Sequence, residues 1–182
     1  MLESWVNMLS CPSFIALLAA LVLATVDVHA DDVQRREDQF KAAYLFNFVK
    51  FVEWPAGAAT DALTVCFLGG EGVYEALASG IDVKRVGARK LIARQLGQPA
   101  TVADCEVLYA DAASMDPSLA VGLPVLTVSD APQFATRGGM IELFTENHRL
   151  RFVINVGNVH RAGLRISSDL LKLAASVQRE ER

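Results

Sequence analysis

Histidine and cysteine are scarce in this chain of 182 residues, which has three of each. No two cysteines stand in the C-x-x-C spacing of thiol oxidoreductases, so catalytic thiol exchange is not indicated. If the first 30 residues are removed as a leader, the remaining residues of these two types are Cys66, Cys105, His148 and His160. We take these as too few for a zinc site. The sequence therefore predicts no metal or other cofactor.

Three patterns typical of common functions are also missing. Positive charge is not clustered, and its densest stretch, residues 84–94, is more simply a solvated strand edge, so nucleic acid is not an expected partner. The glycines of residues 69–72 are not followed by Gly-Lys-Ser/Thr, so phosphate binding is not indicated there. We find no nucleophile beside a base and no carboxylate pair in a recognisable setting. The sequence therefore predicts that the protein is not an enzyme.

The first 30 residues contain no Lys or Arg but include one long apolar run. Residues 14–26 are too short for a comfortable membrane span, and Val28 and Ala30 place small residues where signal peptidase requires them. We therefore predict a signal peptide over residues 1–30, cleavage after Ala30 and export of the mature chain. The missing positive charge is atypical of a signal peptide, and an uncleaved anchor is the alternative.

Removing 30 of the 182 residues leaves 152, which suits one domain with a hydrophobic core. Of the 21 acidic residues, Glu3 and Asp27 are lost, which leaves 19 against 17 basic ones and a net charge of −2. Cys66 and Cys105 remain, 39 residues apart, and an even number of cysteines in an exported protein is typical of a disulfide. Such a bridge would stabilise the fold by roughly 3 to 4 kcal/mol. Two buried free thiols are the alternative.

The strongest helical pattern covers residues 34–52. Aromatic residues recur there at helical spacing and predict a wide apolar face that packs on a sheet: Phe40, Tyr44, Phe48 and Phe51. Pro55 would end the helix, and the polar residues within it are too frequent for a membrane span. Asn47 falls on the apolar side, where a buried amide needs hydrogen-bond partners. Phe46 falls on the opposite side among charged residues, so it is either a partner contact or covered by a second packed layer.

The rest of the mature chain alternates between short strands and helices. Strand patterns cover residues 63–68, 90–95, 105–109 and 125–128, and helical patterns cover residues 73–79, 117–121, 156–162 and 169–178, the last with Ser168 as its N-cap. Residues 140–145 and 149–156 flank a turn-prone stretch and predict a hairpin. Together these patterns predict one compact α/β domain over residues 31–182, with a central mixed β-sheet flanked by helices and an edge hairpin near residues 140–156.

Two long and unusual stretches stand out near the ends of the mature chain: KAAYLFNFVKFVEWP (Lys41 to Pro55) and RLRFVINVGNVHRAGLRISSDLLKLA (Arg149 to Ala174). The second contains an R-x-R-F-x-I-N run and an A-G-L-x-[IL]-S-S-x-L-L-x-L-A ending. Together they resemble the opening and closing motifs of the YfiR family of periplasmic proteins. The resemblance covers nearly the whole mature chain, although residues 56–140 match mainly in the order of their strands.

The resemblance implies a regulator that needs no catalytic group. Family members are exported α/β homodimers that repress an inner-membrane diguanylate cyclase through its periplasmic portion, and an outer-membrane lipoprotein can draw the repressor away. Cyclic di-GMP then rises and favours biofilm over motility. The resemblance also implies a disulfide between Cys66 and Cys105. The second disulfide of some members has no counterpart, because residues 140–149 contain no cysteine.

Partner contact is predicted for five residues within the two end segments: Phe46, Arg149, Arg151, Arg165 and Ile166. For Phe152, Ile154 and Ile166 the alternative is packing in the core of strands, and the sequence favours that alternative.

Two functions of other classes stay open. One is a periplasmic small-molecule sensor for another membrane signalling protein, with a pocket near residues 69–72 or near Ser129 and Asp130. The other is a hydrolase with an unrecognised carboxylate site.

Overall fold

The computed structural model describes residues 31–55, 61–80, 85–97 and 100–179. The chain divides into two compact units, residues 1–37 and 38–182. In the first unit, residues 31–37 are helical and mostly exposed, and the predicted signal peptide with Ala30 lies outside the described residues. In the second unit, residues 38–48 are helical, and we call them the N-terminal helix.

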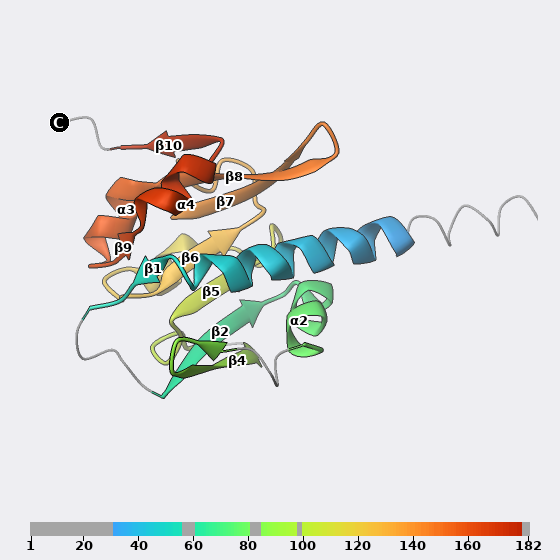
Figure 1. The fold of residues 1–182 in the computed structure, drawn as a ribbon, viewed down its shortest axis with the longest axis horizontal. Coiled ribbons are helices and arrows are strands. Elements are labelled where there is room, and N and C mark those ends of the chain that lie inside the picture. Colours follow the sequence, from blue (N-terminus) through green and yellow to red (C-terminus); the bar gives the residue numbers. More distant parts are fainter. Residues whose placement is uncertain (1–30, 56–60, 81–84, 98–99, 180–182) are drawn as a thin grey trace, which may run out of the picture. The chain divides into compact units, whose positions relative to one another are not determined.

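Short strands and helices alternate along the second unit (Figure 1). Its strands are β1 (Val52–Glu53), β2 (Ala62–Leu68), β3 (Arg85–Val86), β4 (Arg89–Gln95), β5 (Val107–Ala110), β6 (Leu126–Ser129), β7 (Ile141–Glu146), β8 (Arg149–Asn155), β9 (Arg165–Ile166) and β10 (Ser176–Gln178). After the N-terminal helix come α2 (Glu71–Ala78), the 3-10 helix η2 (Pro117–Ala120), α3 (Val156–Arg161) and α4 (Ser168–Leu173). This arrangement confirms the predicted α/β class.

One mixed sheet dominates the unit. Its eight strands stand in the order β10-β8-β7-β6-β5-β2-β4-β3, whereas β1 and β9 form a separate two-stranded sheet. Strands β4, β2, β5, β6 and β7 are parallel, and β8 returns antiparallel to β7. The β7–β8 pair is the predicted hairpin, and its turn residues Asn147 and His148 have positive φ angles of 50° and 59°, as a two-residue hairpin turn requires. The hairpin is next to the edge of the large sheet and not at the edge itself, because β10 pairs with β8 and forms the edge strand.

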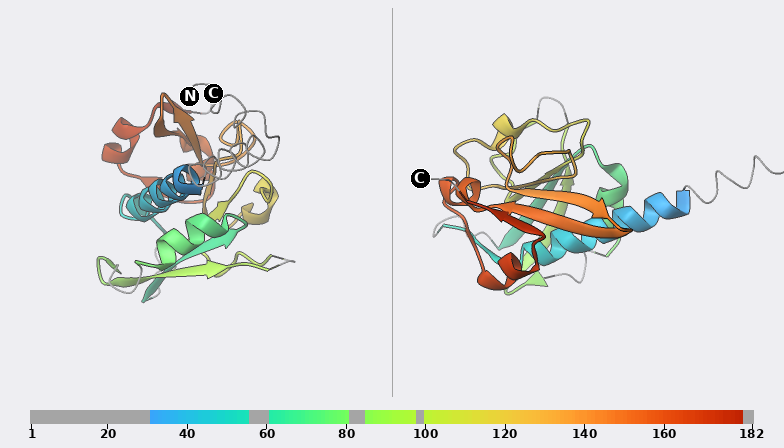
Figure 2. Two further views of the ribbon diagram at one scale, coloured as in Figure 1. Left: turned by 90° about the vertical axis from the view of Figure 1, so that its right-hand side faces the viewer. Right: turned by 90° about the horizontal axis from the view of Figure 1, so that it is seen from above.

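The side chains of the central strands alternate between two hydrophobic clusters on opposite faces of the sheet. Val65 and Phe67 of β2 belong to the cluster that packs against the N-terminal helix, α2, α3 and α4. Cys66 and Leu68 belong to the other cluster, which η2 covers through Ala120. Figure 2 shows the N-terminal helix and η2 on opposite sides of the sheet. Both faces are therefore buried, which explains the nearly continuous apolar sequence of β2.

The N-terminal helix ends earlier than predicted and is rotated about its axis. It ends at residue 48, and a turn leads into β1, so the prediction that Pro55 ends it is wrong. Phe40 is 61% exposed and Asn47 is also exposed, although both were predicted on the buried side. The buried apolar stripe consists of Ala42, Leu45, Phe48, Val49 and Val52. Lys41 is buried on the same side of the helix as this stripe, because its ammonium pairs with Asp130. This ion pair explains why the buried side differs from the predicted one. Residue 40 is turned about 100° away from Lys41.

The chain end also differs from the prediction of one helix over residues 169–178. The helix α4 ends at Leu173, and β10 then pairs with β8. Ser167, not Ser168, is the N-cap, and its hydroxyl accepts a hydrogen bond from the Leu170 backbone N–H at 3.3 Å. The free edge of β8 explains the strand, because its unpaired backbone groups gain hydrogen bonds from β10 that a longer helix would not supply.

Candidate functional site

An aromatic cluster joins the opening and closing segments inside the core. Phe48 is 1% exposed and its ring lies edge-on to Phe152 of β8, with centroids 5.1 Å apart. The Tyr44 ring lies 5.8 Å from both rings, and its hydroxyl donates a hydrogen bond to the Leu150 carbonyl at 3.0 Å. The aromatic residues of the opening segment therefore hold the N-terminal helix against β8.

A two-stranded sheet joins the same segments a second time. In this ribbon, β1 and β9 pair antiparallel, with Val52 opposite Ile166 and Glu53 opposite Arg165. Val52 is buried and Ile166 is half-buried against the core, whereas Glu53 and Arg165 are exposed. The ribbon therefore has one face anchored in the core and one charged face outward.

An open cavity of about 550 Å³ adjoins the ribbon and is lined by His160, Gly163, Leu164, Arg165 and Ile166. Gly163 follows α3 with a φ of 72°, a conformation that favours glycine, and this turn directs the chain into β9. A Cβ atom at Gly163 would lie 3.4 Å from the Pro55 ring. The turn thus brings the two segments into close contact beside the cavity.

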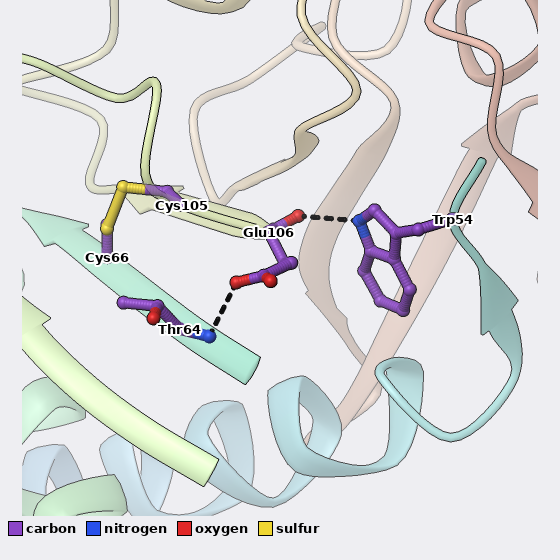
Figure 3. The surroundings of a disulfide bond; sticks show 5 residues. All are labelled: Trp54, Thr64, Cys66, Cys105 and Glu106. Carbon is purple, nitrogen blue, oxygen red and sulfur yellow. Dashed lines mark hydrogen bonds between the residues drawn. A yellow bond between two sulfur atoms is a disulfide. The ribbon is translucent and has the colours of Figure 1, made fainter. Parts of the chain in front are cut away.

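Trp54, directly after β1, attaches the ribbon to the large sheet (Figure 3). Its indole N–H donates to the Glu106 carbonyl at 3.2 Å. The Glu106 carboxylate is buried, where it accepts a hydrogen bond from the Thr64 backbone N–H at 2.7 Å and pairs with the Arg89 guanidinium. Arg89 Nε also donates to the Ala62 carbonyl at 2.9 Å. Hydrogen bonds on both sides compensate the cost of burying this ion pair.

The predicted disulfide lies beside Trp54 and Glu106 (Figure 3). It joins Cys66 of β2 to Cys105, and the two Cα atoms are 5.8 Å apart. Both cysteines are buried. Because Glu106 follows Cys105 directly, the covalent bond and the Glu106 hydrogen bond fasten the same two strands at one place.

Lys41 closes a buried polar cluster at the other end of the N-terminal helix. It is 6% exposed, and its Nζ lies 2.6 Å from the Asp130 carboxylate at the carboxyl end of β6. The Tyr109 hydroxyl donates to the same carboxylate oxygen at 3.2 Å. Burial, followed by the negative charge of Asp130, raises the pKa of Tyr109, so the phenol remains a proton donor. The cluster fixes the helix over the carboxyl edge of the sheet.

Side chains also fill the place where parallel sheets usually bind ligands. Ligands usually bind at the carboxyl ends of parallel strands, at the point where the strand order reverses. In this sheet β4 lies on one side of β2 and β5 lies on the other, so the order reverses between β2 and β5. The Asp111 carboxylate accepts a hydrogen bond from the Gly70 N–H at 3.0 Å, and a Cβ atom at Gly69 would collide with it. A Cβ atom at Gly72 would collide with Asp38. Two carboxylates thus lie against the start of α2, which makes this edge unsuited to an anionic ligand.

A known family of proteins matches the part of the chain that contains the two end segments. The family model described as YfiR/HmsC-like matches residues 38–175, a span that includes both segments and the disulfide. The chain belongs to the YfiR/HmsC-like family. Membership confirms the resemblance and implies a periplasmic regulator of diguanylate cyclase signalling rather than a catalyst.

For this YfiR/HmsC-like protein, Phe46 is a weaker candidate contact than its position on a helical wheel suggests. Its ring is half-buried and packs against the core. The Lys50 ammonium lies 3.9 Å from the ring centroid, in the geometry of a cation–π contact. Phe46 therefore has a packing role whether or not a partner touches it.

The predicted arginine contacts lie in two separate places. Arg149 and Arg151 are exposed on β8 next to the hairpin turn, and Arg151 pairs with Glu146 at 3.3 Å. Arg165 and Ile166 lie in the ribbon. Since β8 runs from the hairpin turn to α3, the first pair is at the carboxyl edge of the parallel strands and the second pair is at the amino edge. The structure does not bring the five predicted contacts into one patch.

Sequence reasoning missed the ion-paired charged residues of the interior, of which Lys41 and Glu106 are buried and Arg89 is half-buried. Lys41 carried a signal, because it stands four residues before Leu45 in the apolar stripe. Arg89 and Glu106 carried none, since their pairing depends on the contact between β2, β4 and β5. Among the residues that the structure describes, no group of three His, Cys, Asp or Glu side chains is placed to hold a metal ion. In the same described ranges, no helix has the length and apolar character needed to cross a bilayer.

Proposed function

We propose that this protein represses an inner-membrane diguanylate cyclase by docking on its periplasmic domain with the outward face of the ribbon. The observation that supports this role is that the two segments typical of the family meet in the ribbon and expose Glu53 and Arg165. Docking that favours the inactive cyclase lowers cyclic di-GMP by an amount set by the difference in affinity between the two cyclase states. An outer-membrane lipoprotein that competes for the repressor reverses the effect.

Three features suit the ribbon to docking. Val52 and Ile166 anchor it in the core, so it presents a fixed surface. Glu53 and Arg165 place opposite charges side by side, which favours a partner with the complementary order of charges. Within the described residues, β1 and β9 pair only with each other, so a strand of the partner can add to either edge.

The exposed arginines of the hairpin suit a second interface. Arg149 and Arg151 lie at the opposite edge of the sheet from the ribbon, so one small contact patch does not include both places. In this proposal they serve the lipoprotein or the second copy in a homodimer. Phe46 acts mainly by supporting the helix.

Gene deletion followed by measurement of cellular cyclic di-GMP tests this function. We expect a rise that the exported wild type reverses and a version without residues 1–30 does not. Arg165→Glu should fail to restore repression. Arg85→Glu is the matched control, because it reverses the charge of an exposed arginine on β3, at the far end of the large sheet. An unchanged cyclic di-GMP level after deletion would refute repression, and full rescue by Arg165→Glu would refute docking through the ribbon.

A further inference from the structure

A second cavity, of about 420 Å³, lies where β2, β5 and β6 begin. Its volume is within the range of small-molecule sites in proteins, about 300 to 1,000 Å³. Trp54, Thr64, Cys105 and Glu106 line it, and Figure 3 shows these four side chains together. The cavity does not share a lining residue with the cavity beside the ribbon.

Another part of the lining follows from the pairing of β2 with β4. Thr64 stands opposite Ile92, and Cys66 stands opposite Arg94. Residues that pair in this way point to the same face of a sheet. Cys66 belongs to the hydrophobic cluster on the η2 side, so Ile92 and Arg94, which both line the cavity, point to that side as well. The cavity is therefore on the η2 side of the sheet, next to the disulfide.

The inner wall of the cavity offers one polar group to a ligand. Thr64 is 6% exposed, and its backbone N–H donates to the Glu106 carboxylate at 2.7 Å. Across the described parts of the chain, the Thr64 hydroxyl has no hydrogen-bond partner. A hydroxyl can both donate and accept a hydrogen bond. The Thr64 hydroxyl can therefore bind a polar group of a ligand inside the cavity.

Two charged side chains of opposite sign stand at the rim. Arg94 and Asp104 are exposed and line the cavity. In the ranges that the structure describes, neither side chain forms an ion pair or a hydrogen bond, and they do not pair with each other. Glu106 also carries a charge, but the Arg89 guanidinium balances it. The rim therefore has one cation and one anion available to a ligand, with a gap between them.

The remaining lining is mainly apolar, and Trp54, Ile92 and Pro124 supply its larger surfaces. A ligand with a single charge would pair with one rim group and lie close to the other, which has the same sign as the ligand. A zwitterion pairs with both rim groups. An apolar body suits the walls, because a polar body would leave hydrogen-bonding groups unsatisfied there.

We propose that this cavity binds a small zwitterion with an apolar body, of the chemical class of α-amino acids with apolar side chains. The carboxylate pairs with Arg94, and the ammonium pairs with Asp104. The Thr64 hydroxyl donates to the carboxylate, and the apolar body packs against Trp54 and Ile92. The site goes beyond the docking function proposed above, because the docking residues of the ribbon do not line it.

Titration with three probes of matched carbon chain tests the proposal on the protein purified from the periplasm. Norleucine is a zwitterion, hexanoate lacks its ammonium group, and pentylamine lacks its carboxylate. Isothermal titration calorimetry measures the three affinities. The fluorescence of Trp54 reports binding in the cavity, because removal of residues 1–30 leaves Trp54 as the one tryptophan of the chain. We expect norleucine to shift this fluorescence and to bind at least about tenfold more tightly than either other probe. No binding of norleucine, an unchanged fluorescence, or equal affinities for all three probes would overturn the proposal.

Three variants assign the two charges. Arg94→Gln should make norleucine bind no more tightly than pentylamine, and Asp104→Asn should make it bind no more tightly than hexanoate. Both positions are exposed, so both variants should fold as the wild type does. Arg85→Gln is the matched control, because it neutralises an exposed arginine that does not line the cavity, and it should preserve the wild-type order of affinities. If norleucine keeps its advantage over pentylamine in Arg94→Gln, or over hexanoate in Asp104→Asn, the site is refuted. None of these results depends on the cyclase.

Discussion

Truncation of Phe48 to alanine tests whether the aromatic cluster holds the opening segment in place. The ring is 1% exposed and lies edge-on to Tyr44 and Phe152, at 5.8 and 5.1 Å. Burial of a phenylalanine contributes about 2 to 3 kcal/mol. The cavity left after truncation adds to the loss, so Phe48→Ala should lower the free energy of unfolding by about 3 to 5 kcal/mol. For a domain of this size the melting temperature should then fall by about 10 °C.

Urea denaturation followed by circular dichroism measures this loss directly. Phe40→Ala is the matched control, because it removes the same side chain from the same helix at a position that is 61% exposed. We expect the control to change the free energy of unfolding by no more than about 0.5 kcal/mol. A loss of less than about 1 kcal/mol for Phe48→Ala would refute the packing argument. Equal losses in both variants would place the buried stripe through Phe40, as the sequence pattern alone predicts.

Three further experiments probe the other contacts of the fold. Arg89→Gln leaves the buried Glu106 carboxylate without its cation, so we expect a loss of about 3 kcal/mol in urea denaturation, and Glu106→Gln in the same chain should recover part of it. Replacing both Cys66 and Cys105 with alanine opens a loop of 39 residues and should cost about 4 kcal/mol, and a reductant should then lower the stability of the wild type but not that of the variant. Burial acts to raise the pKa of Asp111, but hydrogen bonds from a serine hydroxyl and from backbone N–H groups outweigh it and hold that pKa below its ordinary value. The stability gained from the Asp111 carboxylate is thus present at neutral pH and lost in acid, and below about pH 4 the wild type should lose stability more steeply than Asp111→Asn.

The inner strands could be located from the sequence because they are buried on both faces. Such strands need apolar side chains in nearly every position, and the runs at β2, β5 and β6 therefore stand out. The shortest strands could not be located. Strands β1, β9 and β10 have two or three residues, and they form because a neighbouring backbone offers hydrogen bonds, which no local pattern encodes.

The candidate site shows the same division between local pattern and distant contact. The two end segments could be recognised from their residues, but the pairing of Val52 with Ile166 depends on the path of the chain through the whole sheet. Helical spacing treats Phe40 and Phe48 as equivalent, since both are aromatic and eight residues apart. The ion pair between Lys41 and Asp130 removes that equivalence, because it selects the side of the helix that faces the sheet.

The two ends of the opening segment are anchored at opposite edges of the large sheet. Lys41 anchors it at the carboxyl edge of the sheet through Asp130, and Trp54 anchors it at the amino edge through Glu106. The ribbon lies between Trp54 and the helix, so disturbing either anchor displaces the ribbon without touching its surface. Substitution of either anchor should therefore lower stability and partner binding together, because Lys41 is buried and Trp54 is half-buried against the core. Arg165 is exposed, and reversal of its charge should impair binding while the free energy of unfolding stays within about 0.5 kcal/mol of the wild type. Measuring both quantities for each variant thus separates residues that contact the partner from residues that position the ribbon.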